Sequence, residues 1–418
     1  MNFKSKFMNI LQERGFLNQC SDFEEMDRVL LDAEKTGNPC VGYLGSDPTG
    51  DSLHVGHLVP VMIMRWFQKC GNKPLMLVGG ATGRIGDPSG KDTQRPFLSD
   101  EIIKNNSDGL KKSYSKFISF GENKTDSVLV DNYDWFKGIG YLEFLREVGA
   151  NYSINKMLSK DSVKSRLDRE QSMSFLEFNY QLLQGYDFVE LNRRYGCTMQ
   201  LCGSDQWGNA ITGVELGHKL VQKDFHVLSA PILTDASGKK MGKSEGNAVW
   251  LNEDKLSSYD YYQYWRNVED TEVIKLLKIF TELPMDKIRE YESYEGAELN
   301  EVKKILAFEC TKLCRGEAEA ISAQQTAIEA FEKGHFGGDL PTFEKDFSTG
   351  PFNAVDLFIE CNLGASKKEV RRLIDQGGAK INDEKISDAN LEIDTSYLND
   401  GQVVLAAGKK KKAIIKNI

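Results

Sequence analysis

The expected architecture of this chain starts from residues 41–57, VGYLGSDPTGDSLHVGH. The opening VGYLGS is a short apolar run that predicts a buried strand, and the DPTGDS that follows has the composition of a turn. A helix is expected from Leu53 onward, with Ser52 as its N-cap. His54 and His57 would then share one face of the first helical turn, where backbone N–H groups and the helix dipole favour an anion such as a phosphate.

The next apolar run supports a parallel sheet. After the expected helix, which would end near Lys69, the stretch PLMLVGG at residues 74–80 predicts a second strand. Strand, turn, helix and strand in this order begin a parallel sheet of the Rossmann type, and such sheets bind ligands at the carboxyl ends of their strands. The turn lacks GxGxxG, which argues against a dinucleotide site. We therefore expect an α/β fold with a Rossmann-like parallel-sheet catalytic domain.

A second motif lies far downstream. Residues 240–244, KMGKS, place two lysines around Met241 and Gly242 in a loop suited to bring ammonium groups to a triphosphate. Lysines in a polar loop are usually only solvated, so the pentapeptide alone carries little weight. HVGH followed by KMGKS resembles the HIGH and KMSKS pair of the class I aminoacyl-tRNA synthetases, with Gly242 where the third residue of the second motif is usually Ser.

Further motifs make this resemblance more specific. They are GGATGRIGDPSGK (79–91), DNYDW (131–135), YQLLQGYD (180–187) and GSDQWGN (203–209). Together with the first two, they resemble the tyrosyl-tRNA synthetases of the bacterial type, and the resemblance extends over nearly the whole chain. By spacing alone, Tyr180, Gln184 and Asp187 share one face of a helix expected over residues 175–191.

The resemblance implies a reaction in two steps. Tyrosine attacks the α-phosphate of ATP to give tyrosyl-adenylate and pyrophosphate, and the tyrosyl group then passes to the 3′ end of tRNA(Tyr). ATP is a substrate, Mg²⁺ would travel with it, and no metal site is expected in the protein itself. Because the attacking carboxylate is already ionised, the rate must come from positioning and from stabilising charge on the phosphates.

The family's motifs assign residues to each part of this site. Catalytic hydroxyl, imidazole and cationic groups are expected at Thr49, His54, His57, Lys91, Arg95, Lys240, Lys243 and Ser244. Tyrosine binding is assigned to Tyr43, Asp87, Asn132, Tyr180, Gln184, Asp187 and Gln206. ATP binding is assigned to Gly45, Asp47, His54, His57, Gly203, Asp205 and Lys243.

Within the tyrosine group, the roles follow the chemistry of the substrate. Tyr43 and Asp187 are expected on the phenol hydroxyl, and Asp87, Tyr180 and Gln184 on the ammonium group, with Gln206 near the carboxylate. Polar partners for the phenol are what allows phenylalanine to be rejected. Tyrosyl-tRNA synthetases are themselves the reference case, because they prefer tyrosine over phenylalanine by a factor of about 10⁵.

The C-terminal part of the chain differs in character. We expect a catalytic domain with a dimer-forming insertion over residues 1–235, the KMSKS loop and an α-helical domain over 236–340, a linker over 341–352, and a small α+β domain of the S4 type over 353–418. Contacts with RNA are expected from the basic helix face of Lys367, Lys368, Arg371 and Arg372.

Composition limits the partners and the compartment. The net charge of −9 at pH 7 argues against a protein that coats nucleic acid over its whole surface. The eight cysteines include no CxxC, which argues against a zinc site and favours reduced thiols. No apolar run suits a membrane span, and residues 1–16 predict an amphipathic helix and not a signal peptide. A cytoplasmic location is expected, with an organelle left open.

The family works as a homodimer, and the aromatic-rich stretch 131–167 is the expected interface.

Two other functions stay open at this point. The sister tryptophanyl enzymes share the fold and the chemistry, although an indole pocket would not want Tyr43 and Asp187 facing a hydroxyl. The chain could instead be an RNA-binding protein on a synthetase scaffold, although the intact HVGH and KMGKS argue against it.

Three residues depart from the family's motifs: Ser46 where Phe is frequent, Cys202 where a second Gly is common, and Arg84, a charge with no role suggested by the sequence.

Overall fold

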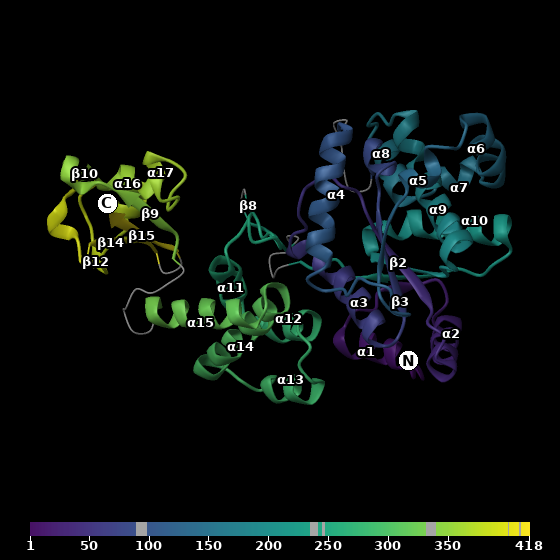
Figure 1. Ribbon diagram of the computed structural model, residues 1–418, viewed down its shortest axis with the longest axis horizontal. Helices are drawn as coiled ribbons and strands as arrows, with labels where there is room; N and C mark the ends of the chain where they lie inside the picture. The colour runs from purple at the N-terminus through teal and green to yellow at the C-terminus, as the bar shows by residue number, and fades with distance from the viewer. Residues whose placement is uncertain (89–97, 235–240, 245–246, 332–339, 400, 409–410) are drawn as a thin grey trace. The chain divides into compact units, whose positions relative to one another are not determined.

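The computed structural model describes residues 1–418 except 89–97, 235–240, 245–246, 332–339, 400 and 409–410 (Figure 1). The chain forms two compact units. The first contains Met1–Leu256 and Val268–Arg315, and the second contains Ser257–Asn267 and Gly316–Ile418. No described helix is both long enough and apolar enough to cross a membrane.

The first unit is built on a six-stranded sheet with the strand order β1-β6-β5-β2-β3-β4. The strands are β1 (Gln19–Cys20), β2 (Val41–Ser46), β3 (Lys73–Val78), β4 (Val128–Asp131), β5 (Met199–Gly203) and β6 (His226–Ala230). All neighbouring pairs are parallel except the edge pair β1 and β6. The chain winds from β2 outward to β4, then crosses to β5 and β6 on the other side. The direction therefore changes between β2 and β5, which is where open parallel sheets bind ligands. The expected Rossmann-like fold is confirmed.

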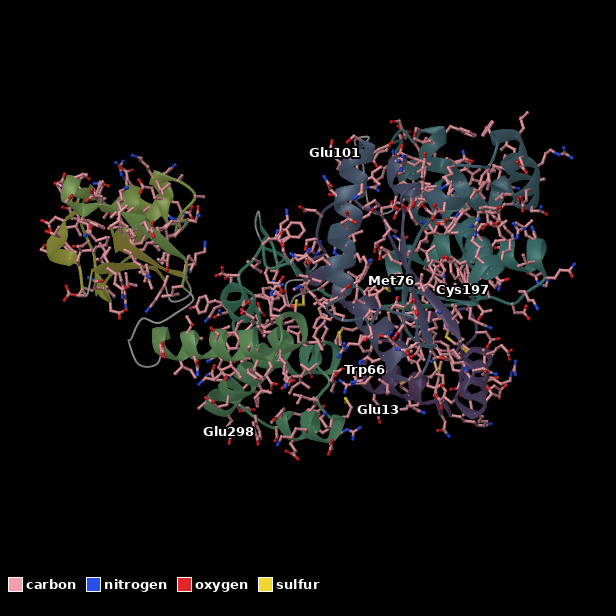
Figure 2. The ribbon with its side chains drawn as sticks, in the orientation of Figure 1. Glu13, Trp66, Met76, Glu101, Cys197 and Glu298 are labelled. Carbon is pink, nitrogen blue, oxygen red and sulfur yellow. The ribbon has the colours of Figure 1, made fainter. Side chains whose placement is uncertain are left out.

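Burial explains the composition of the central elements. In β3, every residue from Pro74 to Val78 is buried, as expected of a strand covered on both faces. The helix that follows β2, α3 (Leu58–Lys69), buries apolar side chains all around its circumference and so lies in the interior. Met76 on β3 and Cys197 just before β5 are both fully buried (Figure 2).

The sheet is accompanied by helices of very different length. They are α1 (Lys6–Arg14), α2 (Phe23–Thr36), α4 (Asp100–Tyr114), α5 (Tyr133–Phe136), α6 (Tyr141–Glu147), α7 (Ile154–Leu158), α8 (Asp161–Asp168), α9 (Phe175–Tyr195), α10 (Trp207–Val221), α12 (Val273–Phe280), α13 (Met285–Tyr291) and α14 (Gly296–Arg315). The long helix α9 starts at a capping box between Ser174 and Glu177 and ends at Gly196 in the left-handed conformation.

The helix expected from Leu53 begins five residues later, at Leu58. Residues 53–55 pair with residues 249–251 instead: the Val55 N–H donates to the Val249 carbonyl, and the Leu251 N–H to the Leu53 carbonyl, both at 2.9 Å. The prediction that Ser52 is the N-cap is therefore wrong. A 3₁₀ turn, Val55–His57, precedes α3, and His54 caps it.

The second unit has its own sheet and core. Five strands lie in the order β12-β11-β14-β15-β9, with β10 paired to β13. The strands are β9 (Thr342–Lys345), β10 (Phe352–Asn353), β11 (Ala379–Ile381), β12 (Glu384–Lys385), β13 (Glu392–Ile393), β14 (Gln402–Ala407) and β15 (Lys411–Asn417), and the helices are α11 (Ser258–Arg266), α15 (Glu317–Phe331), α16 (Ala354–Glu360) and α17 (Lys367–Asp375). The stretch 341–352, expected as a linker, includes β9, which pairs in parallel with β15.

Candidate active site

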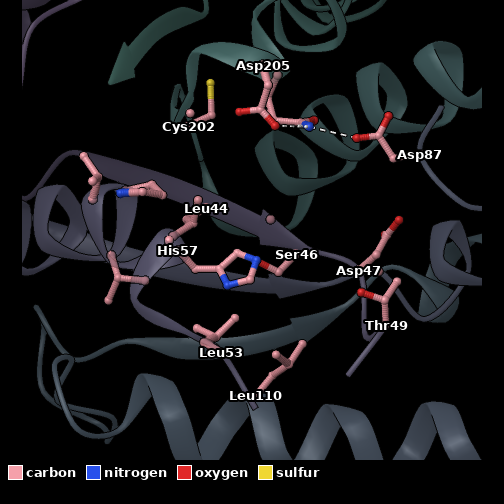
Figure 3. A pocket seen from close by; sticks show the side chains of 18 of the residues that line it. Leu44, Ser46, Asp47, Thr49, Leu53, His57, Asp87, Leu110, Cys202 and Asp205 are labelled. Carbon is pink, nitrogen blue, oxygen red and sulfur yellow. Dashed lines mark hydrogen bonds between the residues drawn. The ribbon is translucent and has the colours of Figure 1, made fainter. Parts of the chain in front are cut away.

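A cleft of about 980 Å³ opens at the carboxyl ends of β2 and β5 in the first unit (Figure 3). The sequence-predicted residues that line it are Tyr43, Gly45, Asp47, Thr49, His54, His57, Asp87, Tyr180, Gln184, Asp187, Gly203, Asp205 and Gln206. They come from segments that are far apart along the chain. The fold therefore brings together most of the residues assigned to tyrosine and ATP.

At one end of the cleft, Tyr43 and Asp187 are buried. The Tyr43 hydroxyl has no hydrogen-bond partner within the part of the chain that the structure describes. Burial raises the pKa of Tyr43 well above its usual value, and the charge of nearby Asp187 raises it further. A buried hydroxyl left unpaired costs about 1–3 kcal/mol, so a ligand that supplies a partner is favoured here.

Asp187 is held from behind by two N–H donors. Its Oδ1 accepts from Trp135 Nε1 at 2.9 Å, and its Oδ2 accepts from Asn132 Nδ2 at 3.1 Å. Burial raises the pKa of this carboxyl, while the two hydrogen bonds act in the opposite direction. Each carboxylate oxygen has two lone pairs and accepts one of these hydrogen bonds, so both keep acceptor capacity for a group in the cleft that Asp187 lines.

Asn132 was expected in the tyrosine pocket but does not line it. The side chain is fully buried behind the cleft, where its Oδ1 accepts from the Ala81 N–H at 2.7 Å and its Nδ2 donates to Thr82 Oγ1 at 2.9 Å. Through these bonds it joins the loop after β3 to Asp187. Its place in the structure is that of a support for Asp187.

Gln200 was missed by the sequence reasoning. It lies on β5 directly opposite Tyr43 in the strand register, lines the cleft, and is buried. Its Oε1 has no hydrogen-bond partner among the described residues, so the strand next to Tyr43 carries a second buried polar group without a partner. Its place just before GSDQWGN, inside a strand, gave no separate signal. Trp135 and Thr82 were also missed as individual residues, although the DNYDW and ATG motifs contain them.

Carboxylates surround the middle of the cleft. Asp47 accepts hydrogen bonds from Thr82 Oγ1 at 2.7 Å and from the Tyr180 hydroxyl at 2.9 Å. Asp87 accepts from Gln206 Nε2 at 2.8 Å, along the dashed line in Figure 3. Burial, together with the charge of Asp47, raises the pKa of Tyr180 well above its usual value. An ammonium group would be favoured among these charges.

The other end of the cleft carries the two histidines, whose ring centroids are 4.0 Å apart. His54 Nδ1 accepts from the Gly56 N–H at 3.0 Å, and His57 Nδ1 accepts from the His54 N–H at 3.3 Å. An imidazole nitrogen that accepts carries no proton, so each neutral ring has its proton on Nε2. Both Nε2–H groups are the kind of donor that a phosphate oxygen accepts from. Trp250, another residue missed from sequence, packs edge-on against His54 at 6.0 Å between centroids.

Several predicted residues fall outside this description. Lys91, Arg95 and Lys240 lie outside the described residues. Lys243 and Ser244 form the short strand β7 (Lys243–Ser244), paired with β8 (Asn247–Ala248), and only their backbone is described.

The three departures from the family's motifs have identifiable surroundings. Ser46 Oγ accepts from the Tyr114 hydroxyl at 2.7 Å, and burial raises the pKa of Tyr114 to about 12. Cys202 lines the cleft, and burial raises the pKa of its thiol. The Arg84 guanidinium lies 4.3 Å from the centroid of the Tyr133 ring and pairs with Asp100 at 2.6 Å.

In the second unit, the basic residues expected to contact RNA share the exposed face of α17. These are Lys367, Lys368, Arg371 and Arg372. The opposite face of the helix buries Val370 and Ile374 in the core of this unit. The charges therefore face solvent, as an electrostatic contact with RNA requires.

Family models and full-length relatives match this chain. Residues 35–332 match a family model described as class I tRNA synthetases (W and Y), and residues 332–415 match the tyrosine–tRNA ligase SYY-like C-terminal domain. The tyrosine–tRNA ligase of Caulobacter vibrioides is 48% identical over 420 residues, covering 100% of this chain and 99% of the relative. The tyrosine–tRNA ligase of Rhodospirillum rubrum is 46% identical over 415 residues, covering 99% and 98%.

Solved structures give the same picture. The C-terminally truncated mitochondrial tyrosyl-tRNA synthetase of Aspergillus nidulans is similar with a TM-score of 0.70 and 29% identity, covering 78% of this chain and 95% of that one. The tryptophanyl-tRNA synthetase of Encephalitozoon cuniculi shares the fold, with a TM-score of 0.54 and 12% identity, covering 76% and 87%.

Proposed function

This chain belongs to the tyrosine–tRNA ligases of the class I tRNA synthetase family, and we propose from that premise how its cleft divides the work of the reaction. The expected family and enzyme class are confirmed by the full-length relatives. The roles of individual residues are the proposal. The single observation that carries them is the buried, unpaired hydroxyl of Tyr43 beside the carboxylate of Asp187.

The substrate's phenol hydroxyl donates to Asp187 and accepts from Tyr43. Both protein groups are already desolvated, so tyrosine gives the Tyr43 hydroxyl a partner and gives Asp187 a further donor, whereas phenylalanine leaves the Tyr43 hydroxyl unpaired. Asp87, Tyr180 and Gln184 receive the ammonium group, and Gln206, which donates to Asp87, lies near the carboxylate. The substrate carboxylate is thereby directed toward the phosphate end of the cleft.

At that end, ATP is held with its α-phosphate within reach of the substrate carboxylate. A carboxylate oxygen forms a bond to the α-phosphorus while the bond from that phosphorus to the bridging oxygen of pyrophosphate breaks. Negative charge builds up on the leaving phosphates, and the Nε2–H groups of His54 and His57 and the Thr49 hydroxyl stabilise it. Gly45, Asp47, Gly203 and Asp205 line the adenylate, and Lys91, Arg95, Lys240, Lys243 and Ser244 are assigned to the phosphates by motif.

Magnesium enters this proposal only with ATP. Among the described residues, no group of three His, Cys, Asp or Glu side chains is arranged to hold a metal ion. Mg²⁺ commonly binds through substrate phosphates and keeps several waters, which requires no protein cage. No step described above depends on a protein-bound metal.

Transfer of the tyrosyl group requires tRNA(Tyr), and the second unit is proposed to hold it through the face of α17. Replacing Lys367, Lys368, Arg371 and Arg372 together by Ala is expected to raise KM for tRNA and to lower its dependence on salt concentration. Adenylate formation without tRNA should be unchanged. An unchanged KM for tRNA would contradict this role.

We also propose a homodimer in the cytoplasm, and a division of the chain at residues 235, 340 and 352. Apolar side chains between α6 and α9 are strongly exposed, with Leu142 at 74%, Phe175 at 66% and Ile154 at 64%, and such surfaces usually mark interfaces. None of the eight cysteines, all of them among the described residues, forms a disulfide, which suits a reducing compartment. Sedimentation of the wild type and of Leu142→Glu tests the interface: the wild type should be dimeric and the variant should dissociate.

ATP–pyrophosphate exchange with each of the twenty amino acids tests the whole assignment. Exchange that depends on tyrosine alone is the expected result. Exchange with tryptophan would select the sister enzyme, and no exchange with any amino acid would select an RNA-binding protein.

A further inference from the structure

The KMGKS segment touches the HVGH segment through two glycines, Gly242 and Gly56. Gly242 has a φ of +87°, in the left-handed region that favours glycine. A Cβ at Gly242 would lie 2.4 Å from the backbone nitrogen of Gly56, 3.1 Å from its Cα and 3.3 Å from His54 Nδ1. The first distance is far shorter than any real carbon contact. The obstacle is backbone, which cannot rotate away as a flexible side chain would.

The contact is close from the other side as well. A Cβ at Gly56 would lie 3.0 Å from the Met241 carbonyl oxygen and 2.8 Å from Cε1 of the His54 ring. The two backbones therefore approach closely: a side chain at Gly242 would overlap the Gly56 backbone, and one at Gly56 would crowd the His54 ring and the Met241 carbonyl. Sequence alone gives Gly242 no such importance, because the third residue of this motif in the class I family is usually Ser.

Neighbouring hydrogen bonds keep the two segments in this arrangement. The Met241 N–H donates to the Leu233 carbonyl at 3.0 Å, and the Val249 N–H donates to the Gly242 carbonyl at 3.2 Å. The Val249 carbonyl in turn accepts at 2.9 Å from the N–H of Val55, the residue before Gly56. A side chain at Gly242 would have to break part of this pairing to relieve the overlap.

The atom that a side chain at Gly242 would displace has a second role. The Gly56 N–H is the donor that occupies His54 Nδ1 and thereby leaves the His54 proton on Nε2, toward the phosphate end of the cleft. Gly242 thus reaches the reacting phosphates through Gly56 and His54, and it is a positioning residue.

We propose that the contact between Gly242 and Gly56 sets both the place of the KMGKS segment and the orientation of His54, so that Ser cannot replace Gly242 in this chain. This inference rests on the proposed function of the cleft in tyrosine activation. It predicts a defect that concerns ATP and leaves the tyrosine end of the cleft as it is.

The test compares Gly242→Ala and Gly242→Ser with Gly71→Ala. Gly71 has nearly the same φ, +86°, but a Cβ there would meet nothing within 4 Å. The control therefore places Ala at the same positive φ without the contact. In tyrosine-dependent ATP–pyrophosphate exchange, we expect kcat/KM for ATP to fall about 100-fold in both Gly242 variants, since a misplacement of about 1 Å can have that effect. KM for tyrosine should be unchanged, and Gly71→Ala should keep both constants.

Gly56→Ala and the double variant sharpen the result. If both glycines act through one contact, the double variant should lose little more than Gly242→Ala alone. Unchanged tyrosine binding shows that the variants are folded. The proposal is overturned if Gly242→Ser keeps wild-type ATP kinetics, if Gly71→Ala loses as much, or if KM for tyrosine rises in parallel. A wild-type protein without tyrosine-dependent exchange would instead overturn the proposed function.

Discussion

The two ends of the cleft are organised differently. At the tyrosine end, Asp187 is 2% exposed and Tyr43 is fully buried with its hydroxyl unpaired. At the phosphate end, His57 is exposed, and the key approach is between backbones, at Gly56 and Gly242. Burial penalises a substrate that lacks the right polar group, so it provides discrimination. In the proposed assignment, accessibility lets a charged product leave, and the donors of the phosphate end contact the reacting groups without enclosing them.

The largest effect is expected from Asp187→Ala, which tests the tyrosine end of the cleft. Removing the carboxylate takes away the acceptor of Trp135 Nε1 and one of the two acceptors of Asn132 Nδ2 in the interior, and it removes the proposed acceptor of the substrate phenol. We expect kcat/KM for tyrosine to fall about 1,000-fold, and the preference for tyrosine over phenylalanine to fall with it. Pyrophosphate exchange with both amino acids measures this. The matched control is Asp224→Ala, an aspartate whose side chain is 86% exposed, and it should behave as wild type.

Lys243→Ala tests the phosphate end in the same way. The lysine is assigned to the phosphates by its motif, so its removal should slow adenylate formation about 100-fold, as the loss of one transition-state donor does elsewhere. Single-turnover kinetics measure the rate, and equilibrium dialysis measures tyrosine affinity, which should not change. Equal losses of rate and affinity would refute the division of the cleft into two ends.

Tyr43→Phe gives a smaller effect of mixed sign. Tyrosine affinity should fall about 10-fold, because one neutral hydrogen bond is lost. The ligand-free protein should become more stable by about 1 kcal/mol, because the unpaired buried hydroxyl is gone. Thermal unfolding without and with tyrosine measures both. A less stable ligand-free variant would mean that the Tyr43 hydroxyl is not a free-energy penalty in the empty cleft.

The pH dependence of tyrosine binding should also report on the buried end. Burial raises the pKa of Asp187, so the folded protein binds this proton at a higher pH than the unfolded chain does. From the ordinary aspartate pKa of about 4 upward, the free energy of unfolding of the ligand-free protein should therefore fall as pH rises through the raised value. Tyrosine affinity should move the opposite way and rise a few-fold as pH rises through the same raised pKa, because the ionised carboxylate accepts the phenol. Asp187→Asn should flatten both curves.

Arg84→Leu is expected to have the smallest effect. The Arg84 side chain is 30% exposed and its partner Asp100 is 86% exposed, so the ion pair is strongly screened. Together with the contact to the Tyr133 ring, it should contribute about 0.5–1 kcal/mol to stability. Urea unfolding measures this loss. A drop in tyrosine affinity would show that Arg84 matters beyond the loop that it braces.

Local sequence patterns predicted several elements well. The strand Val41–Ser46 has the bounds expected from its apolar run, and α9 begins at Phe175 as expected and continues to Tyr195. In both cases the signal is local: a run that must be buried, a capping residue and a periodic apolar face. The helix start at Leu53 was misplaced because residues 53–55 pair with a segment nearly two hundred residues away, and no local pattern contains that partner.

The second unit shows the same limit. Helix α11 belongs to residues 236–340, which the sequence predicts only as an α-helical domain. In the structure its Tyr259 packs against Val404 and Ile414 of the C-terminal sheet. An amphipathic sequence pattern predicts that one face of a helix is buried, but it does not predict which surface that face packs against.

The sequence by itself determined the family, the parallel sheet, the reaction, and most residues of the cleft, because motifs and hydrophobic periodicity can be recognised from residues that are close together along the chain. Only the tertiary structure decided that Asn132 supports Asp187 from behind, that Gln200 and Tyr43 on neighbouring strands each carry an unpaired polar group, and that Gly242 lies against Gly56. Hydrogen-bond satisfaction and close backbone approach depend on which distant segments meet, and that is fixed by how the whole chain packs.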